Sequence, residues 1–64
     1  MADTYTMSYI NDSGTTSTIS VKKDGNYYYD ADDNYYQIDS DGNLLRLKKG
    51  ETEYEKIGTD ASAK

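Results

Sequence analysis

The sequence has no cysteine, histidine, tryptophan, phenylalanine or proline among its 64 residues. Without cysteine it has no disulfide to stabilise a small fold, and without cysteine or histidine it lacks the ligands that zinc prefers. The absence of histidine also removes the side chain that acts most readily as a general base near neutral pH. A chain of this length buries only about 60% of its unfolded surface and has little room for an enclosed pocket. We therefore expect one small domain that binds other molecules, with no catalytic residues, no metal site and no cofactor.

The sequence also has no long apolar run, and its longest aliphatic stretch is Leu44-Leu45. A membrane-spanning helix needs about 20 predominantly apolar residues. Residues 1–20 contain neither the basic start nor the apolar centre of a signal peptide. The lack of cysteine fits a reducing compartment. These features predict a cytoplasmic protein with no membrane association.

The apolar residues that are present recur at every second position, which is typical of β-strands. Tyr5, Met7 and Tyr9 alternate with polar residues, and Ile19 and Val21 do so in the next segment. Turns rich in Asp, Asn and Gly separate such runs, and the strands are expected at 5–9, 16–22, 27–29, 35–38, 44–48 and 51–57. The predicted fold class is all-β: an antiparallel meander of five or six short strands that forms a single curved sheet or a small open barrel. Residues 1–57 would form the domain and residues 58–64 a flexible polar tail.

Alternation within each expected strand also predicts which side chains face the core. The inward set comprises Met7, Tyr9, Ile19, Val21, Tyr27, Tyr29, Tyr36, Ile38, Leu45, Leu47 and Ile57. Tyr28 and Tyr35, together with Tyr5, are left on the solvent side. Because a tyrosine ring is large and apolar while its hydroxyl is polar, an exposed tyrosine is well suited to an interface.

The net charge of −5 is concentrated in one segment. Residues 24–43 contain six aspartates and no basic residue, together with five of the eight tyrosines, whereas the segments on either side are close to neutral. The six acidic residues are Asp24, Asp30, Asp32, Asp33, Asp39 and Asp41. We interpret this segment as a candidate partner-binding surface, to which Tyr28 and Tyr35 would also contribute.

Turn formation and calcium binding are alternative roles for some of these aspartates. Aspartate is favoured in turns because its carboxylate accepts hydrogen bonds from nearby backbone amides; the aspartates to which this role applies are Asp24, Asp30, Asp39 and Asp41. A calcium loop is suggested by Asp30, Asp32 and Asn34, which have the spacing of the first three ligands of an EF-hand. Tyr35 stands where that loop requires glycine, so no metal site is predicted.

A surface rich in carboxylates repels nucleic acid but attracts the basic groove of a protein that binds nucleic acid. The small size, the acidity, the β-hairpins and the lack of catalytic residues together resemble the small inhibitors that phages encode against host defences. Examples are the anti-CRISPR proteins that block Cas9 and the inhibitors of uracil-DNA glycosylase. The resemblance implies that the six aspartates stand in for DNA phosphates on a basic, nucleic-acid-binding protein of the Cas nuclease type. It also implies a phage protein that acts in the host-cell cytosol and makes no direct contact with nucleic acid.

A second resemblance is local. Residues 24–32, DGNYYYDAD, are similar to one unit of the aromatic hairpin repeats in choline-binding and glucan-binding cell-wall modules. This similarity implies a carbohydrate or cell-wall ligand held by Tyr28 and Tyr35. The triplets Asp24-Gly25-Asn26 and Asp41-Gly42-Asn43 also suggest a weak internal repeat, in which each triplet opens a hairpin.

Two alternative functions and one question of assembly therefore stay open beside the inhibitor. The first is a carbohydrate or cell-wall binding module. The second is a β domain with a purely structural or interaction role, whose acidity only confers solubility. The third concerns assembly: a homodimer could form through the strand edges or through the face that carries Tyr28 and Tyr35.

Overall fold

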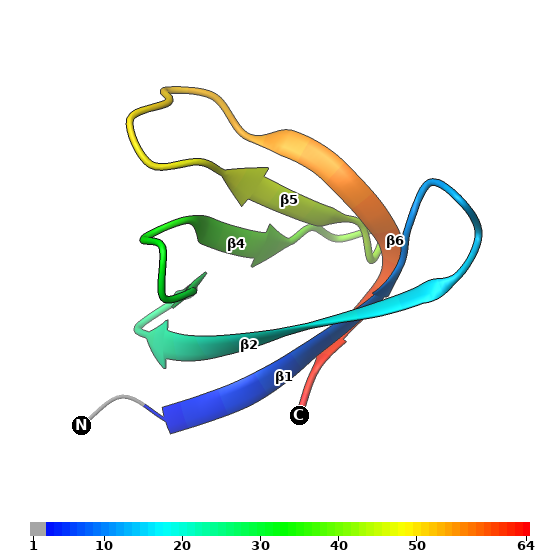
Figure 1. Cartoon of the computed structure of the whole chain (residues 1–64), viewed down its shortest axis with the longest axis horizontal. Coiled ribbons are helices and arrows are strands. Elements are labelled where there is room, and N and C mark those ends of the chain that lie inside the picture. The colour runs from blue at the N-terminus through cyan, green and yellow to red at the C-terminus, as the bar shows by residue number, and fades with distance from the viewer. Residues whose placement is uncertain (1–2) are drawn as a thin grey trace.

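The computed structural model of the chain describes residues 3–64 and shows six β-strands joined by short turns (Figure 1). The strands are β1 (Asp3–Ile10), β2 (Thr16–Asp24), β3 (Tyr27–Tyr29), β4 (Tyr35–Ile38), β5 (Leu44–Leu47) and β6 (Glu55–Ala63). Each strand pairs antiparallel with the next one along the chain, and residues 3–64 contain no helix. The predicted all-β meander of hairpins is confirmed.

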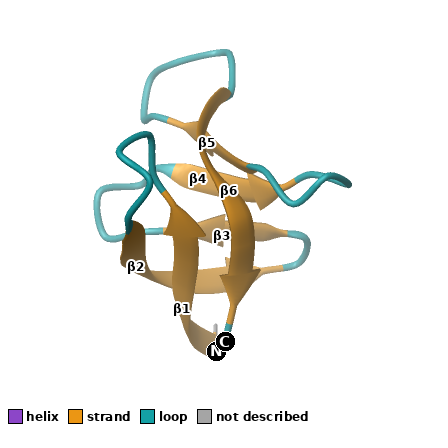
Figure 2. Ribbon diagram, turned by 90° about the vertical axis from the view of Figure 1, so that its right-hand side faces the viewer, coloured by secondary structure: helices purple, strands orange, loops and turns teal. Residues whose placement is uncertain are grey.

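The sheet closes on itself because β6 returns to pair with β1, as Figure 2 shows. Met7 lies opposite Ala63, and Thr6 and Lys64 exchange two backbone hydrogen bonds of 2.8 and 3.1 Å. The result is a closed barrel, whereas the sequence had suggested a curved sheet or an open barrel. Closure pairs residues 6–10 of β1 with β6, so this part of the two terminal strands presents no free edge.

Residues 58–63 form the second half of β6, so the prediction of a polar tail from residue 58 is wrong. The segment GTDASA has no large apolar residue, which is why its alternation gave no strand signal. Small residues are what this position requires, because a Cβ on Gly58 would lie 2.7 Å from the carbonyl oxygen of Ile10. Ala61 and Ala63 pack against the core. The β domain therefore extends through residue 63.

The buried centre of the barrel consists of four side chains, each no more than 2% exposed: Met7, Val21, Tyr36 and Leu44. Partly buried side chains pack around them, namely Tyr5, Tyr9, Ile19, Tyr28, Ile38, Ile57, Ala61 and Ala63. This set confirms the inward side chains predicted for β1, β2 and β4, except that Tyr5 of β1, expected on the solvent side, also packs against the core. Since the core is so thin, tyrosine rings supply much of its apolar area.

The predicted faces of β3 and β5 are wrong. Tyr28 lies opposite Tyr36, and Leu44 lies opposite Ile38, so Tyr28 and Leu44 point into the barrel. The side chains turned outward instead are Tyr27, Tyr29, Leu45 and Leu47. The sequences YYY and LLRL carry apolar residues on both faces, so only the register with a neighbouring strand decides which face is buried. Tyr5 also faces inward, with its ring centroid 5.8 Å from that of Tyr28.

Three five-residue loops share one design, at 11–15, 30–34 and 39–43. The first side chain of each loop accepts hydrogen bonds from the backbone N–H groups two and four residues later; these first residues are Asn11, Asp30 and Asp39. The fourth residue has a positive φ, with values of 80, 63 and 83° at Gly14, Asp33 and Gly42. The unit that recurs in the structure is therefore this five-residue loop.

The turn between β2 and β3 is of a different kind from these loops. Asp24 pairs with Tyr27 across a two-residue turn, Gly25-Asn26, and Gly25 has a φ of 63°. Asp41-Gly42-Asn43, in contrast, forms the last three positions of a five-residue loop. The two triplets that suggested a repeat in the sequence therefore have different structures.

Candidate binding site

The carboxylate of Asp30 is used inside the β3–β4 loop. Its Oδ1 accepts hydrogen bonds from the N–H groups of Asp32 (2.9 Å) and Asn34 (3.0 Å), and its Oδ2 accepts them from the Asn34 side-chain amide (3.0 Å) and the Tyr36 hydroxyl (2.7 Å). Burial acts to raise the pKa of Asp30, but these hydrogen bonds outweigh it and hold the pKa below its usual value. Burial and the Asp30 carboxylate together raise the pKa of the Tyr36 hydroxyl. Asp30 therefore ties its loop to the core.

Asp39 accepts the corresponding hydrogen bonds within the β4–β5 loop. Its Oδ1 accepts hydrogen bonds of 2.9 Å from the N–H groups of Asp41 and Asn43, and its Oδ2 accepts one of 3.0 Å from the Asn43 side chain. The hydrogen bonds from Asn43 are the main cause that lowers the pKa of Asp39. Two of the six predicted partner-binding aspartates are thus engaged in shaping loops.

The other four aspartates are exposed, namely Asp24, Asp32, Asp33 and Asp41. Asp33 Oδ2 lies 3.8 Å from Lys49 Nζ, and such an exposed ion pair contributes little to stability. The β3–β4 loop and the β4–β5 loop lie at opposite ends of the four-residue strand β4, which separates them by about 13 Å. Asp32 and Asp33 are therefore separated from Asp41, and the exposed carboxylates are not gathered in one patch.

The two tyrosines predicted to bind a partner have different surroundings. Tyr35 is 44% exposed on the outer face, in agreement with the sequence. Tyr28 instead packs against the core, with the ammonium of Lys23 lying 5.7 Å from its ring centroid. The tyrosine that accompanies Tyr35 outside is Tyr27, which is 48% exposed and had been assigned to the core.

An aromatic hollow lies on the outer face of β3, β4 and β5. Its volume is about 420 Å³ and its lining consists of Asp24, Tyr27, Tyr35, Leu47 and Tyr54; we call these five residues the aromatic hollow. The rings of Tyr27 and Tyr35 meet edge to face, with centroids 6.2 Å apart and an interplanar angle of 70°. Tyr54 comes from the β5–β6 loop, and burial, followed by the nearby Tyr27 and Tyr35 hydroxyls, raises its pKa.

The aromatic hollow cannot be predicted from the alternation of residues within any single strand. Tyr35 lies opposite Leu47 on the next strand, and Asp24 lies opposite Tyr27, so directly paired residues bring their side chains to the same face. Tyr54 joins them from the β5–β6 loop. The available sequence signal was the row of apolar residues on both faces of β3 and β5, which leaves an apolar outer face whatever the register.

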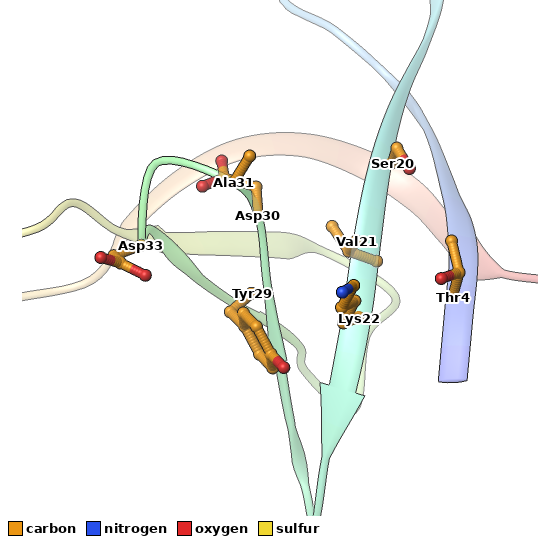
Figure 3. Close-up of a pocket in the computed structure, with 8 residues that line it drawn as sticks. All are labelled: Thr4, Ser20, Val21, Lys22, Tyr29, Asp30, Ala31 and Asp33. Atoms are coloured by element: carbon orange, nitrogen blue, oxygen red, sulfur yellow. The ribbon is translucent and has the colours of Figure 1, made fainter. Parts of the chain in front are cut away.

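A second hollow of about 350 Å³ lies beside the β3–β4 loop (Figure 3). Figure 3 shows Lys22 and Tyr29 on neighbouring strands, with Asp30 and Ala31 of the loop beside them. Of its two carboxylates, Asp30 is engaged in hydrogen bonds within the loop, whereas Asp33 is exposed, 3.8 Å from Lys49 Nζ. The aromatic hollow is therefore the stronger candidate for a binding site.

The described part of the chain gives no support to two other kinds of site. Within residues 3–64 no group of three or more acidic side chains is arranged to hold a metal ion, and the carboxylate of Asp30 is occupied by four hydrogen bonds. Over the same residues there is no helix with the length and hydropathy needed to cross a membrane.

No protein-family model, curated protein or solved structure matches this chain. The function therefore has to be argued from the geometry and charge described above.

Proposed function

We propose that the protein is a non-enzymatic inhibitor that binds the basic, nucleic-acid-binding surface of another protein and competes there with DNA or RNA. The partner is of the kind represented by Cas nucleases, and the setting is the cytosol of a host cell, as for an anti-CRISPR protein of a phage. The observation that carries this proposal is the aromatic hollow, in which Tyr27 and Tyr35 are 48% and 44% exposed beside the carboxylate of Asp24.

The aromatic hollow has the composition of an interface centre. Tyrosine is enriched among residues that dominate binding energy, and a ring that stays half exposed stabilises the fold less than a buried one, because stabilisation scales with the apolar area removed from water. Asp24 lines the site, and the exposed carboxylates of Asp32 and Asp33 in the β3–β4 loop add to the negative field of the protein. Such a field speeds the encounter with a basic partner, and the tyrosines then supply contact area.

The charge of the protein favours a basic partner over a second copy of the same chain. Each copy carries a net charge of −5, so two copies repel one another on approach. Residues 6–10 of β1 are also unavailable for pairing with a second copy, because they already pair with β6. We therefore assign the aromatic hollow to a different, cationic protein.

The test is a capture experiment followed by a binding measurement. Immobilised wild-type protein is incubated with bacterial lysate, bound proteins are identified by mass spectrometry, and the affinity of each purified candidate is measured. The proposal expects a nucleic-acid-binding target whose affinity falls as NaCl rises and which is displaced by DNA or RNA. A target that binds equally well in high salt and in excess nucleic acid would contradict the proposal.

A matched pair of triple variants sharpens that measurement. Asp24→Asn/Asp32→Asn/Asp33→Asn removes three exposed carboxylates, one in the aromatic hollow and two in the β3–β4 loop, while sparing Asp30 and Asp39. We expect a loss of affinity of about tenfold or more, since rim charges act together on binding. The control changes net charge equally at three exposed positions elsewhere: Asp3→Asn/Asp12→Asn/Asp60→Asn. Equal losses in the two triples would mean that only total charge matters.

A carbohydrate ligand is the second candidate, because tyrosine rings around a hollow can also stack on sugar rings. The ligand would use Tyr27 and Tyr35, since Tyr28 packs against the core. A glycan array probed with wild type and with Tyr27→Ala/Tyr35→Ala separates the two functions. Binding to a glycan that the double variant loses supports this candidate, and an array without signal rules it out in favour of the protein partner.

A further inference from the structure

We propose that the aromatic hollow receives one arginine side chain of the basic partner, with the guanidinium against the tyrosine rings and paired with the Asp24 carboxylate. This inference rests on the proposed function and names the chemical group that the same site recognises. It is argued from the orientation of the rings, the position of Asp24 and the volume of the hollow.

The ring geometry leaves an aromatic face available to a ligand. Tyr27 and Tyr35 meet at 70°, with 6.2 Å between centroids, so the two rings contact edge to face and do not stack on each other. A cation is attracted to the face of an aromatic ring within about 6 Å of its centroid. Because both residues are close to half exposed, a side chain from outside can reach such a face.

Asp24 supplies a carboxylate at the same place. It lies directly opposite Tyr27 in the β2–β3 ladder and lines the hollow with it, so both side chains project from the outer face. No ion pair joins Asp24 to another of residues 3–64. The aromatic hollow thus combines ring faces with an unpaired anion, which is the combination that an organic cation requires.

Within residues 3–64 no basic side chain lines the aromatic hollow. The nearest basic residue in sequence, Lys23, is directed to the inner face, where its ammonium lies 5.7 Å from the ring of Tyr28. That contact shows a cation and a tyrosine ring associating within this same sheet. On the outer face the rings and the carboxylate are present without a basic side chain among the five lining residues, and we assign the cation to the partner.

Arginine suits the aromatic hollow better than lysine does. The guanidinium group is planar, weakly hydrated and able to stack on a ring while it donates two hydrogen bonds to one carboxylate. The ammonium of lysine is compact and strongly hydrated, so it loses more on entering a hollow walled by Leu47 and tyrosines. A volume of about 420 Å³ accepts the guanidinium together with its methylene stem.

The test uses small probes and ¹⁵N-labelled protein, so it does not depend on knowing the partner. N-acetyl-arginine methylamide, the lysine analogue and the neutral citrulline analogue are titrated in parallel while amide chemical shifts are recorded. We expect shifts at residues 24–27, 35, 47 and 54 with the arginine probe, weaker binding by about threefold or more with lysine, and none with citrulline at the same concentration.

Three single variants identify the groups responsible. Asp24→Asn and Tyr27→Leu should abolish the arginine-dependent shifts, whereas Tyr27→Phe, which keeps the ring, should retain them. Asp41→Asn is the matched control, since it removes one exposed carboxylate from the β4–β5 loop, and it should leave the binding unchanged. The spectrum of each free variant verifies that the barrel is folded.

The outcomes separate this inference from the proposed function. Equal binding of arginine and citrulline probes, or equal weakening by Asp24→Asn and Asp41→Asn, would overturn the arginine site. If the partner protein binds wild type but the probes do not bind, this inference fails while the proposed function stands. If the probes bind in the hollow and no basic protein does, the arginine site stands and the proposed function fails.

Discussion

Tyr36 and Tyr35 are neighbours in β4, yet one is 2% exposed inside the barrel and the other is 44% exposed on the outer face. The hydroxyl of Tyr36 donates a 2.7 Å hydrogen bond to Asp30, whereas the ring of Tyr35 meets Tyr27 at the aromatic hollow. The same contrast holds in the β3–β4 loop, where Asp30 is engaged and Asp33 is exposed. Residues of one type in one segment thus serve folding on one side and remain accessible on the other.

This comparison explains why a chain with so little aliphatic core uses so much tyrosine. On the inner face the ring of Tyr36 fills volume, and its hydroxyl donates a hydrogen bond to Asp30 of the β3–β4 loop. On the outer face the same ring stays partly hydrated until a partner covers it. The inward pair, Tyr36 and Asp30, and the outward pair, Tyr35 and Asp33, should therefore respond differently to substitution.

The largest difference is expected from truncation of the two tyrosines. Tyr36→Ala removes a buried ring and should lower the free energy of unfolding by about 3–5 kcal/mol, which is a large part of the total for a domain of this size. Tyr35→Ala should lower it by about 1 kcal/mol or less. Urea denaturation followed by circular dichroism measures both, and similar losses for the two variants would contradict the assignment of inner and outer faces.

Removal of a single hydroxyl is the next largest effect. Tyr36→Phe keeps the ring but deprives the Asp30 carboxylate of a donor, so it should cost about 1–3 kcal/mol. Tyr35→Phe removes an exposed hydroxyl and should change stability by no more than about 0.5 kcal/mol. The double variant Tyr36→Phe/Asp30→Asn checks the coupling: its loss should be smaller than the sum of the two single losses.

The sequence predicted the strands better than it predicted their faces. Turns of Asp, Asn and Gly placed five strands within a few residues, and alternation in β1, β2 and β4 gave the correct inner side. In β3 and β5 the runs YYY and LLRL are apolar on both sides, so the choice depends on pairing with β4. The second half of β6 was missed because close packing at Gly58 demands small residues, and small residues carry no hydrophobic period.

The candidate site was predictable only in part for the same reason. Tyr35 and Asp24 were identified from the sequence, but Tyr27 was assigned to the core and Tyr54 was not singled out. The aromatic hollow needs the register of four consecutive strands, β2 to β5, and the path of the β5–β6 loop, and alternation within a single strand specifies neither. Likewise, the roles of Asp30 and Asp39 follow from loops whose hydrogen bonds close only when the strands meet.

The lowered pKa of Asp30 also predicts how the free energy of unfolding depends on pH. The pKa of Asp30 in the folded state lies below its ordinary value of 3.8, so the unfolded chain takes up the proton first as pH falls. The stability that Asp30 contributes is therefore complete above the unfolded pKa and is lost as pH falls through the folded one. The urea midpoint should decline between pH 5 and pH 2, and it should decline less steeply in Asp30→Asn.

Asp32, an exposed residue of the same loop, serves as the control, and Asp32→Asn should keep the wild-type decline. If Asp32→Asn flattened the decline as much as Asp30→Asn, the role given to Asp30 would be contradicted.

The smallest effect is expected at Asp33, and there stability and binding should move in opposite directions. Asp33 occupies the left-handed position of its loop, with a φ of 63°, where the equivalent loop has Gly42. Asp33→Gly relieves a backbone strain of about 1–2 kcal/mol and costs somewhat less in unfolded-state entropy, so stability should rise by about 0.5 kcal/mol. The 3.8 Å ion pair with Lys49 that the variant loses is exposed and weak.

Asp33→Gly also removes an exposed carboxylate from the surface assigned to a basic partner, so the affinity for the partner should fall. Asp33→Asn separates the two causes, because asparagine tolerates the left-handed conformation while lacking the charge: it should bind as weakly as Asp33→Gly without being more stable than wild type. A gain in stability without any loss of binding would show that Asp33 lies outside the interface.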